Sequence, residues 1–400
     1  MIHSLFKRFR LHFFALAALA LFPLLAILAR IRARGRTGNA PRILVVPILT
    51  RVGDLVCSTP VFREIKMHFP NAHLAVVVGR KAKGILVHNP RIDDLIDYNN
   101  ERFHGFAGRW RFFYFLYSQK FDAVFSLGTS VIGTLSCIFA AAPIRVKTVV
   151  AHPPFFERLT DWMNTDRVTY THGTFLQKHY VSLLSALGVR SAQPIKEVFT
   201  TEAGERKARA FFDGAFGGVP PLLVGMTVSA GNKIKEWPLA RFAEVADILV
   251  EKYGARIIFI DSPANRERTE EVVGLMKRRA AACAIDFSLE ELPSLIKRLH
   301  AFVAVDTGAI YIAHALGVPL VDIIGPVEPN EQPPSDEKSV QVLPASGIEP
   351  TSFVFYSNEC NGNYMPAVLS ITAPQVVAAF ELLIARGFVR NAQPFYEKNS

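Results

Sequence analysis

Short apolar runs alternate with helical stretches along most of the chain after Pro41. The runs are rich in Val, Ile and Leu and are bounded by Gly, Pro or polar residues, as in residues 43–49, 73–79 and 121–128. Continuous apolar runs of this length, joined by helices, are typical of parallel strands that are buried on both faces of a sheet. The pattern therefore predicts an α/β fold with parallel sheets.

The same pattern restarts in the second half of the chain. Residues 221–230 read as a strand that leads into a loop, and VPLVDIIGP closes the series of strands and helices. A polar connection over residues 191–206 separates the halves, so we predict two α/β domains, residues 41–205 and 206–400, the second ending in a tail. Ligands bind outside the carboxyl ends of strands in open α/β sheets, so two such domains would face a cleft.

The first 40 residues differ in composition from the rest. Residues 11–29 carry no charged side chain and would form a helix about 28 Å long, enough to cross the apolar core of a bilayer. Residues 1–40 contain no acids and seven bases, three before the apolar segment and four after it. The seven bases are Lys7, Arg8, Arg10, Arg30, Arg32, Arg34 and Arg36.

These basic flanks favour a membrane anchor over residues 1–40 rather than a cleaved secretory signal or a buried soluble helix. Pro23 would kink the helix near its middle, so a segment that lies in the membrane interface stays open beside a spanning one. The small excess of bases after the apolar segment favours a body in the cytoplasm.

The formal net charge of +10 belongs mainly to this segment. The other 360 residues carry 38 bases against 35 acids, a net charge of only +3. The four cysteines, Cys57, Cys137, Cys283 and Cys360, are scattered without a CxxC pair or a histidine at ligand spacing. The small net charge of the body gives no sign of nucleic-acid binding. The scattered cysteines favour reduced thiols over disulfides or a zinc site, in agreement with a cytoplasmic location.

Asp54 stands directly after the first predicted strand, within RVGDLV. Two interpretations are open and equally weighted. The carboxylate could point into the cleft and take part in chemistry, or it could cap the helix predicted over residues 59–68. Gly53 would serve as a turn residue in the second case.

Two later strand ends have the layout of anion sites. In SAGNKIKEWP, the small residues Ser229 and Ala230 follow a strand, with Lys233 and Lys235 supplying charge, although no Walker or GxGxxG motif is present. The alternative is an exposed basic loop with Trp237 anchoring the next helix.

The second layout is strand, Asp306-Thr307-Gly308, then helix. Unpaired N–H groups and the helix dipole favour a phosphate at such a position, and a glycine lets it approach closely. The alternative is a simple cap by Asp306 or Thr307. We expect His314, further into the helix, to be a packed histidine rather than a ligand.

Together, these segments resemble the ADP-heptose:lipopolysaccharide heptosyltransferases of glycosyltransferase family 9. The resemblance covers residues 42–329 and is carried by RVGDLVCSTP, by KEWP followed by RF, and by DTGAIYIAHALGVP with IIGP. Each motif is modest, but their order and spacing together are specific. The resemblance implies a GT-B fold, in which two Rossmann-like domains face a cleft and the second binds most of the nucleotide sugar.

The resemblance also implies an inverting, metal-independent transfer that needs no cofactor beyond the ADP-sugar donor. Asp54 matches the general base of the family, and Lys235 matches its phosphate-binding lysine. Thr307 and Gly308 match the diphosphate loop, and Asp306 shapes the turn. Ser229 and Ala230 are additional candidate backbone donors to the diphosphate.

One departure from the family concerns Tyr311, which stands where many members have histidine. A tyrosine can still donate a hydrogen bond, but it carries no positive charge near neutral pH. This leaves the identity of the donor open. The loop SAGNKIK also differs from the usual Pro-Gly-Ala wording, and many members lack the membrane segment.

The basic residues Arg80, Lys81 and Lys83 follow a strand of the first domain and could bind acidic groups of a lipid-linked core sugar. A solvated charge run is the alternative. The aromatic-rich residues 102–117 could face the membrane or the acceptor, or form part of the core.

The sequence thus predicts an inverting glycosyltransferase attached to the inner membrane, which moves heptose from an ADP-sugar to a lipopolysaccharide-core acceptor. The alternatives are a transferase of the same fold with another donor or acceptor, and a non-catalytic sugar-nucleotide-binding scaffold in envelope assembly.

Overall fold

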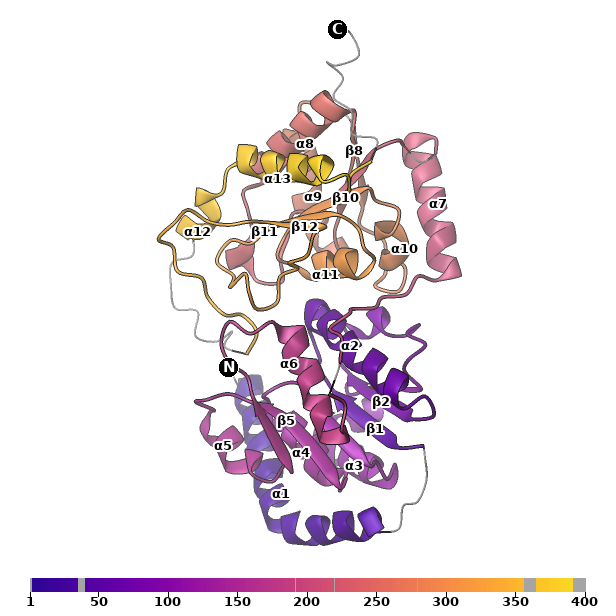
Figure 1. Ribbon diagram of the computed structural model, residues 1–400, viewed down its shortest axis with the longest axis vertical. Helices are drawn as coiled ribbons and strands as arrows, with labels where there is room; N and C mark the ends of the chain where they lie inside the picture. Colours follow the sequence, from indigo (N-terminus) through magenta and orange to yellow (C-terminus); the bar gives the residue numbers. More distant parts are fainter. Residues whose placement is uncertain are drawn as a thin grey trace. The chain divides into compact units, whose positions relative to one another are not determined.

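The chain forms two compact units, Met1–Ile195 (unit 1) and Lys196–Ser400 (unit 2), each built on one parallel sheet (Figure 1). The boundary lies inside the predicted connection, whereas the prediction began the second domain at residue 206. The computed structural model describes residues 2–34, 40–190, 192–218, 220–278, 280–355 and 365–390, with side chains described from residue 11 onward. Ser191, Cys360 and the tail over residues 391–400 lie outside the described residues.

The sheet of unit 1 has the strand order β3-β2-β1-β4-β5-β6. Its strands are β1 (Arg42–Val46), β2 (His73–Val78), β3 (Asp94–Asp97), β4 (Ala123–Ser126), β5 (Ile144–Val149) and β6 (Asp166–Thr169). In the centre, Ile43 of β1 pairs with Leu74 of β2 and Ala123 of β4. β1 ends at Val46 instead of residue 49, because Pro47 has no N–H group to donate to the ladder.

Helices cover this sheet. They are α1 (Ile2–Arg34), α2 (Val52–His68), α3 (Gly105–Ser118), α4 (Val131–Phe139), α5 (Phe155–Asp161) and α6 (Leu176–Ser182), with short 3-10 turns η1 (Lys83–Ile85), η2 (Glu101–Phe103) and η3 (Leu183–Leu187). The aromatic-rich segment forms α3 and is divided between the two predicted environments. Phe112 and Phe113 are buried in the core, whereas Phe106 and Tyr114 are exposed.

Unit 2 repeats the plan, with the strand order β12-β11-β10-β7-β8-β9. Its strands are β7 (Leu223–Thr227), β8 (Arg256–Ile260), β9 (Ala281–Ala284), β10 (Ala301–Val305), β11 (Leu320–Ile323) and β12 (Ser339–Val342). Numbered within each unit, both sheets have the Rossmann order 3-2-1-4-5-6. Two Rossmann-like units are therefore confirmed, but VPLVDIIGP does not close the series, because β12 pairs beside it.

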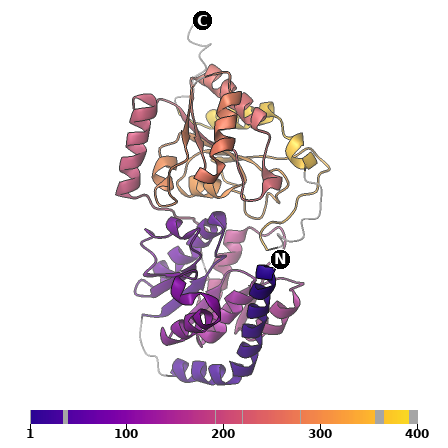
Figure 2. The same cartoon turned by 180° about the vertical axis from the view of Figure 1, so that it is seen from behind.

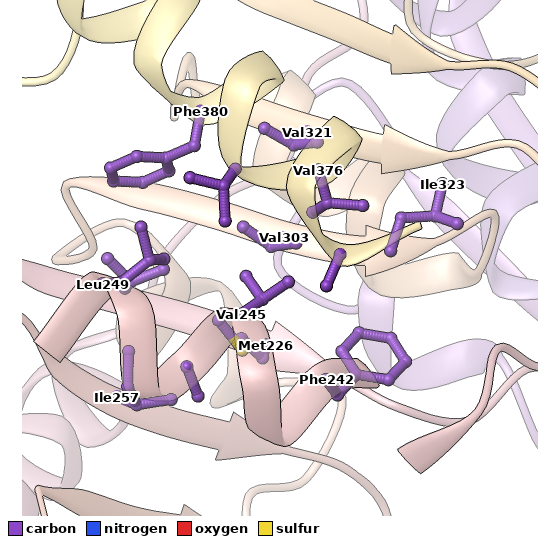
Figure 3. Close-up of a cluster of buried hydrophobic side chains, with 14 of the residues drawn as sticks. Met226, Phe242, Val245, Leu249, Ile257, Val303, Val321, Ile323, Val376 and Phe380 are labelled. Carbon is purple, nitrogen blue, oxygen red and sulfur yellow. The ribbon is translucent and has the colours of Figure 1, made fainter. Parts of the chain in front are cut away.

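The helices of unit 2 are α7 (Glu202–Phe216), α8 (Leu239–Tyr253), α9 (Arg266–Leu275), α10 (Leu292–Ile296), α11 (Gly308–Ala315), α12 (Met365–Ser370) and α13 (Ala373–Ala385), with η4 (Lys233–Lys235) and η5 (Pro263–Asn265). Figure 3 shows Leu249 of α8 and Phe380 of α13 with the sheet residues Val303 and Val321 in one buried cluster. This apolar contact holds both helices against the sheet that carries the strand ends described next.

Within the described residues, α1 is long and apolar enough over Leu11–Arg34 to cross a membrane. In the structure, α1 belongs to unit 1 and buries Phe14, Ala15 and Ala18 against it. It is thus a candidate membrane segment that also packs on the folded body.

Candidate functional site

Asp54 lies in the first turn of α2, the helix that follows β1 in the chain. Arg51 is the N-cap residue, with extended backbone at φ −108 and ψ 125, so the interpretation of Asp54 as the cap is wrong. The helix also begins at Val52 rather than at the predicted residue 59. Asp54 is only 2% exposed and forms an ion pair with Arg51. A carboxylate in a first helical turn is also stabilised by the helix dipole.

The early start of α2 is compatible with Pro60 in its interior. A proline has no N–H group, so the carbonyl of Val56, four residues earlier, loses its usual helical partner. The Thr59 hydroxyl donates to that carbonyl at 2.8 Å. Pro60 therefore lies inside α2, whereas the sequence pattern placed it at the start of a helix over residues 59–68.

Tyr180 of α6 is a neighbour of Asp54 that the sequence did not reveal. Burial raises the pKa of Tyr180 well above its usual value, and the negative charge of Asp54 raises it further. Next to it in the same helix, Gln177 donates from Nε2 to Cys57 Sγ at 2.9 Å, which ties α6 to α2. Asp54 is therefore held by Arg51 and lies near the buried Tyr180 of α6.

His179, also in α6, should make the stability of unit 1 depend on pH. Burial lowers its pKa to about 4, and its Nε2 lies 2.9 Å from Thr148 Oγ1. Histidine in an unfolded chain titrates near 6.5, so the unfolded state binds protons more tightly and stability is lost as the pH falls through this window. Between pH 7.5 and pH 5, the loss from His179 should be about 2 kcal/mol.

Urea unfolding of wild type and His179→Gln at pH 7.5 and pH 5 measures this loss. The variant lacks the titrating imidazole, so its free energy of unfolding should differ much less between the two pH values. His152→Gln, which alters an exposed histidine, is the matched control. An equal pH dependence in wild type and His179→Gln would contradict the expected result.

In unit 2, a lysine and an aspartate that are far apart in sequence meet at the carboxyl ends of two neighbouring strands. Lys235 lies in η4 after β7, and Asp306 follows β10, which pairs with β7. Lys235 Nζ lies 2.6 Å from Asp306 Oδ2, and the side chains are 12% and 4% exposed. Lys235 is also 4.3 Å from the ring centroid of Phe353. The interpretation of this segment as an exposed basic loop is therefore wrong for Lys235.

The part of that interpretation that concerns Trp237 is confirmed, because Trp237 anchors the start of α8. Its ring is buried, and Nε1 donates to the carbonyl of Ile371 at 3.0 Å. The buried tryptophan fixes the position of the short η4 turn just before it. Lys235 thus lies two residues before an anchored tryptophan.

Tyr311 completes the cluster around Asp306. Its buried hydroxyl donates to Asp306 Oδ1, so Lys235 and Tyr311 bind the two oxygens of one carboxylate. Lys196, a further buried cation that the sequence did not single out, lies 5.8 Å from the Tyr311 ring centroid. The three residues predicted to bind the donor here, Lys235, Asp306 and Tyr311, are brought together as one group.

The N-terminus of α11 adjoins this group. Thr307 is the N-cap residue, and Gly308 is the first residue of the helix. Among the described residues, the Thr307 side chain makes no capping hydrogen bond. The side-chain capping interpretation of Asp306 and Thr307 is therefore not what the structure shows, since the Asp306 carboxylate is bound by Lys235 and Tyr311.

Asp322 is a buried acid beside the same group, and it was missed in the sequence. It lies inside β11 in register with Ala304 of β10. Burial raises the pKa of Asp322 well above its usual value and the charge of Asp306 adds to this, while Lys235 opposes it. Neither carboxyl oxygen has a hydrogen-bond partner in the described part of the chain. A single acid within the apolar run VPLVDIIGP was the available signal.

Ser229 belongs to a separate polar group of unit 2. Its hydroxyl donates to Asp261, and Asn265 Nδ2 donates to Ser229 Oγ at 2.9 Å and to Asp261 Oδ1 at 2.7 Å. The neighbouring Ala230 packs against the apolar core. Asp261 follows β8, so this group also lies at the carboxyl end of the sheet.

His314 is largely buried and agrees with the prediction of a packed histidine. Its Nε2 lies 3.1 Å from Asp336 Oδ2. Burial lowers the pKa of His314, and the hydrogen bond to Asp336 opposes that shift. This pair joins α11 to the segment before β12.

The predicted acceptor residues lie on the surface of unit 1 after β2. Arg80 and Lys81 are exposed, and Lys83 begins η1. Arg80 donates to the carbonyl of Asn99 at 2.9 Å and lies 3.8 Å from Asp97 Oδ2. The guanidinium of Arg80 is thus oriented by β3 and the turn after it.

The described residues include no group of three or more His, Cys, Asp or Glu side chains placed to hold a metal ion. Cys57, Cys137 and Cys283 form no disulfide within that part of the chain. Cys57 and Cys137 are buried, and Cys283 is partly buried.

Comparison with known proteins shows which family shares this fold and these motifs. Residues 109–352 match the sequence model of glycosyltransferase family 9 (heptosyltransferase). The lipopolysaccharide core heptosyltransferase OpsX of Haemophilus influenzae is 24% identical over 288 residues, which cover 71% of this chain and 79% of OpsX.

Solved structures show the same fold. A family 9 glycosyl transferase from Veillonella parvula superposes with a TM-score of 0.72 at 24% identity, covering 88% of this chain and 99% of that one. The E. coli heptosyltransferase WaaC with ADP has a TM-score of 0.63 at 17% identity, covering 85% and 99% of the two chains.

Proposed function

Since the chain belongs to glycosyltransferase family 9, the heptosyltransferase family, we propose that it transfers heptose, or a related sugar, from an ADP-sugar to a lipopolysaccharide-core acceptor. The observation that carries the proposal is the group formed by Lys235, Asp306 and Tyr311 beside the N-terminus of α11. Relatives named as heptosyltransferases, one of them solved with ADP, support the choice of donor.

The group in unit 2 suits a nucleotide diphosphate. The first N–H groups of α11 and its dipole favour an anion, and Gly308 lets the phosphate approach the backbone closely. Lys235 supplies a positive charge that is already held in place by Asp306. As the bond between sugar and diphosphate breaks, negative charge grows on the leaving ADP, and groups fixed in advance stabilise that charge.

Asp54 is the proposed general base. The acceptor hydroxyl oxygen attacks the anomeric carbon and forms the new glycosidic bond, while the bond from that carbon to the diphosphate oxygen breaks. The hydroxyl proton passes to the Asp54 carboxylate, and the electron pair of the broken bond leaves with ADP. A single displacement of this kind inverts the anomeric configuration. The ion pair with Arg51 holds the Asp54 side chain in place.

Two further assignments belong to the proposal. Arg80, Lys81 and Lys83 would bind acidic groups of the acceptor, since they form a basic surface after β2. The protein would be attached to the inner membrane through α1, with its body in the cytoplasm, because a lipid-linked acceptor is concentrated at that surface. Metal independence stays a prediction, and transfer should persist after treatment with a chelator.

A second candidate keeps the fold and changes the sugar. The observation that favours it is Tyr311, which places a neutral hydroxyl on Asp306 at the position where the family resemblance implies histidine. A binding protein without catalysis is less well supported, because mere binding of a sugar nucleotide has no use for the buried Asp54.

The test is release of ADP from ADP-heptose in the presence of purified heptose-deficient core lipid. Turnover that depends on both substrates would support the proposal. Binding of ADP-heptose without turnover would contradict the acceptor or the catalytic role. Turnover with another nucleotide sugar in place of ADP-heptose would favour the second candidate.

A further inference from the structure

We propose that α1 lies flat on the membrane surface as part of unit 1, and that its exposed stripe enters the lipid while the helix does not cross the bilayer. The stripe consists of Phe13, Leu16, Ala20, Leu24, Ile27 and Ile31. This inference rests on the membrane attachment in the proposed function and specifies how that attachment is made. The partner is an anionic lipid surface.

One face of α1 is occupied by unit 1. Phe14, Ala15, Ala18 and Ala29 are each at most 3% exposed. The Phe14 ring lies 5.2 Å from that of Trp110 in α3. These residues recur at helical spacing, so one continuous face of the helix is part of the core of unit 1.

Both ends of the apolar segment are held by the same unit. Near the first end, the His12 ring stacks on Phe156 of α5 at 3.7 Å. Near the second end, the Arg32 guanidinium donates to the carbonyls of Ala140 at 2.9 Å and Tyr117 at 3.2 Å. A helix that crossed the bilayer would carry its two ends to opposite sides, where one compact unit could not bind both.

The shape of α1 agrees with a helix that does not cross the bilayer. Figures 1 and 2 both show α1 with a bend, so that its two parts run in different directions along unit 1. Pro23, the proline inside the helix, accounts for the bend. Residues 11–22 alone would reach only about 18 Å, well short of the apolar core of a bilayer, which is about 30 Å thick.

The opposite face of α1 is apolar and exposed, which a soluble surface helix would avoid. Leu16, Leu24, Ile27 and Ile31 are 52–61% exposed. They recur every three, four or eight residues and share one side of the helix. A helix with apolar residues on both faces needs a second apolar environment, and lipid supplies it.

Exposed aromatic residues of unit 1 border the stripe. Phe106 of α3 is 48% exposed and lies 4.9 Å from the Phe13 ring, and Trp162 is 52% exposed and lies 5.1 Å from the Phe22 ring. Aromatic side chains of this kind favour the boundary between lipid and water. The lipid-facing surface thus combines α1 with α3 and the end of α5.

Charge determines which lipid fits. Residues 1–40 contain seven bases and no acids. Arg30 and Arg34 are exposed beside the stripe, whereas Arg32 is turned to unit 1. Each exposed base near a negatively charged membrane adds attraction, so anionic lipids should bind more strongly than zwitterionic ones.

Labelling of single introduced cysteines tests the topology in the full chain. Ser4→Cys and Ala33→Cys stand on either side of the apolar segment, and the unchanged protein measures the background from its native thiols. In sealed inverted inner-membrane vesicles, a membrane-impermeant maleimide should label both variants without detergent. A spanning helix would protect one position until detergent is added, and protection of either position would overturn the proposal.

Flotation of the purified full chain with vesicles of phosphatidylethanolamine and phosphatidylglycerol tests the stripe. Leu24→Glu with Ile27→Glu should lower the partition into vesicles by at least about tenfold, because both charges would enter lipid. Leu382→Glu, at a leucine of α13 that is 41% exposed, is the matched control and should float like wild type. Unchanged flotation of the double variant would overturn the assigned surface.

These measurements are independent of catalysis. A wild type without transferase activity would contradict the proposed function and leave the topology result intact. Transfer to a delipidated, soluble core acceptor should be unchanged in the double variant, because neither residue belongs to the candidate site.

Discussion

Asp54→Asn should lower kcat for sugar transfer by about 10²–10⁴-fold while ADP-heptose still binds. The asparagine keeps the size of the side chain and the first turn of α2, but it cannot accept the proton of the acceptor hydroxyl. The effect should appear in kcat rather than in the donor dissociation constant. Steady-state release of ADP and calorimetric donor binding measure the two quantities separately.

Asp94→Asn is the matched control for this variant, because it neutralises an aspartate of unit 1 whose side chain is 52% exposed. It should retain wild-type kcat. Because Asp54 is buried against Arg51, its replacement leaves a partly buried cation. Circular dichroism and thermal unfolding therefore accompany the kinetics. A folded Asp54→Asn protein with wild-type kcat would remove Asp54 from the role of base.

Lys235→Met should lower kcat/KM by about 10²–10³-fold and weaken the binding of ADP as well. The lysine supplies a fixed positive charge on Asp306, the residue before the N-cap of α11, so its loss should affect both bound diphosphate and leaving ADP. Lys233→Met removes an equal charge from an exposed position of the same turn and should have little effect. The comparison separates a local contact from general electrostatic attraction.

A structural contribution of Lys235 can be separated with a second variant. Removing the lysine leaves Asp306 buried without its cation, which destabilises a protein by about 3–5 kcal/mol in comparable cases. Lys235→Met combined with Asp306→Asn should regain much of that stability but not the activity. Recovery of activity in the double variant would show that the pair serves the fold and not the donor.

The strand pattern predicted the fold well, because continuous apolar runs are the direct requirement of a doubly covered parallel sheet. β2 was predicted to within one residue, and Asp306 directly follows β10 as predicted, whereas β1 ends three residues before its predicted end. The start of α2 was not predicted, because Thr59 replaces the hydrogen bond that Pro60 cannot make. That replacement depends on a side-chain geometry that residue preferences alone do not reveal.

The sequence singled out the residues of the candidate site one by one but did not show which of them lie together. Lys235 and Asp306 are 71 residues apart in sequence, and only the pairing of β7 with β10 makes them neighbours. Tyr180 had no signal at all, since it lies in a helix outside every motif. Asp322 did have one, because an acid inside a buried apolar strand requires a special environment.

The packing of α1 has a consequence for any attempt to separate the catalytic body from its anchor. Deleting residues 1–40, a common way to obtain a soluble form of an anchored enzyme, would strip the cover from Trp110, Phe113 and the apolar residues of α4. The truncated body would then expose a new apolar surface in place of the exposed stripe of α1. The intact chain should instead be prepared in detergent or in a lipid nanodisc, which keeps α1 packed on unit 1.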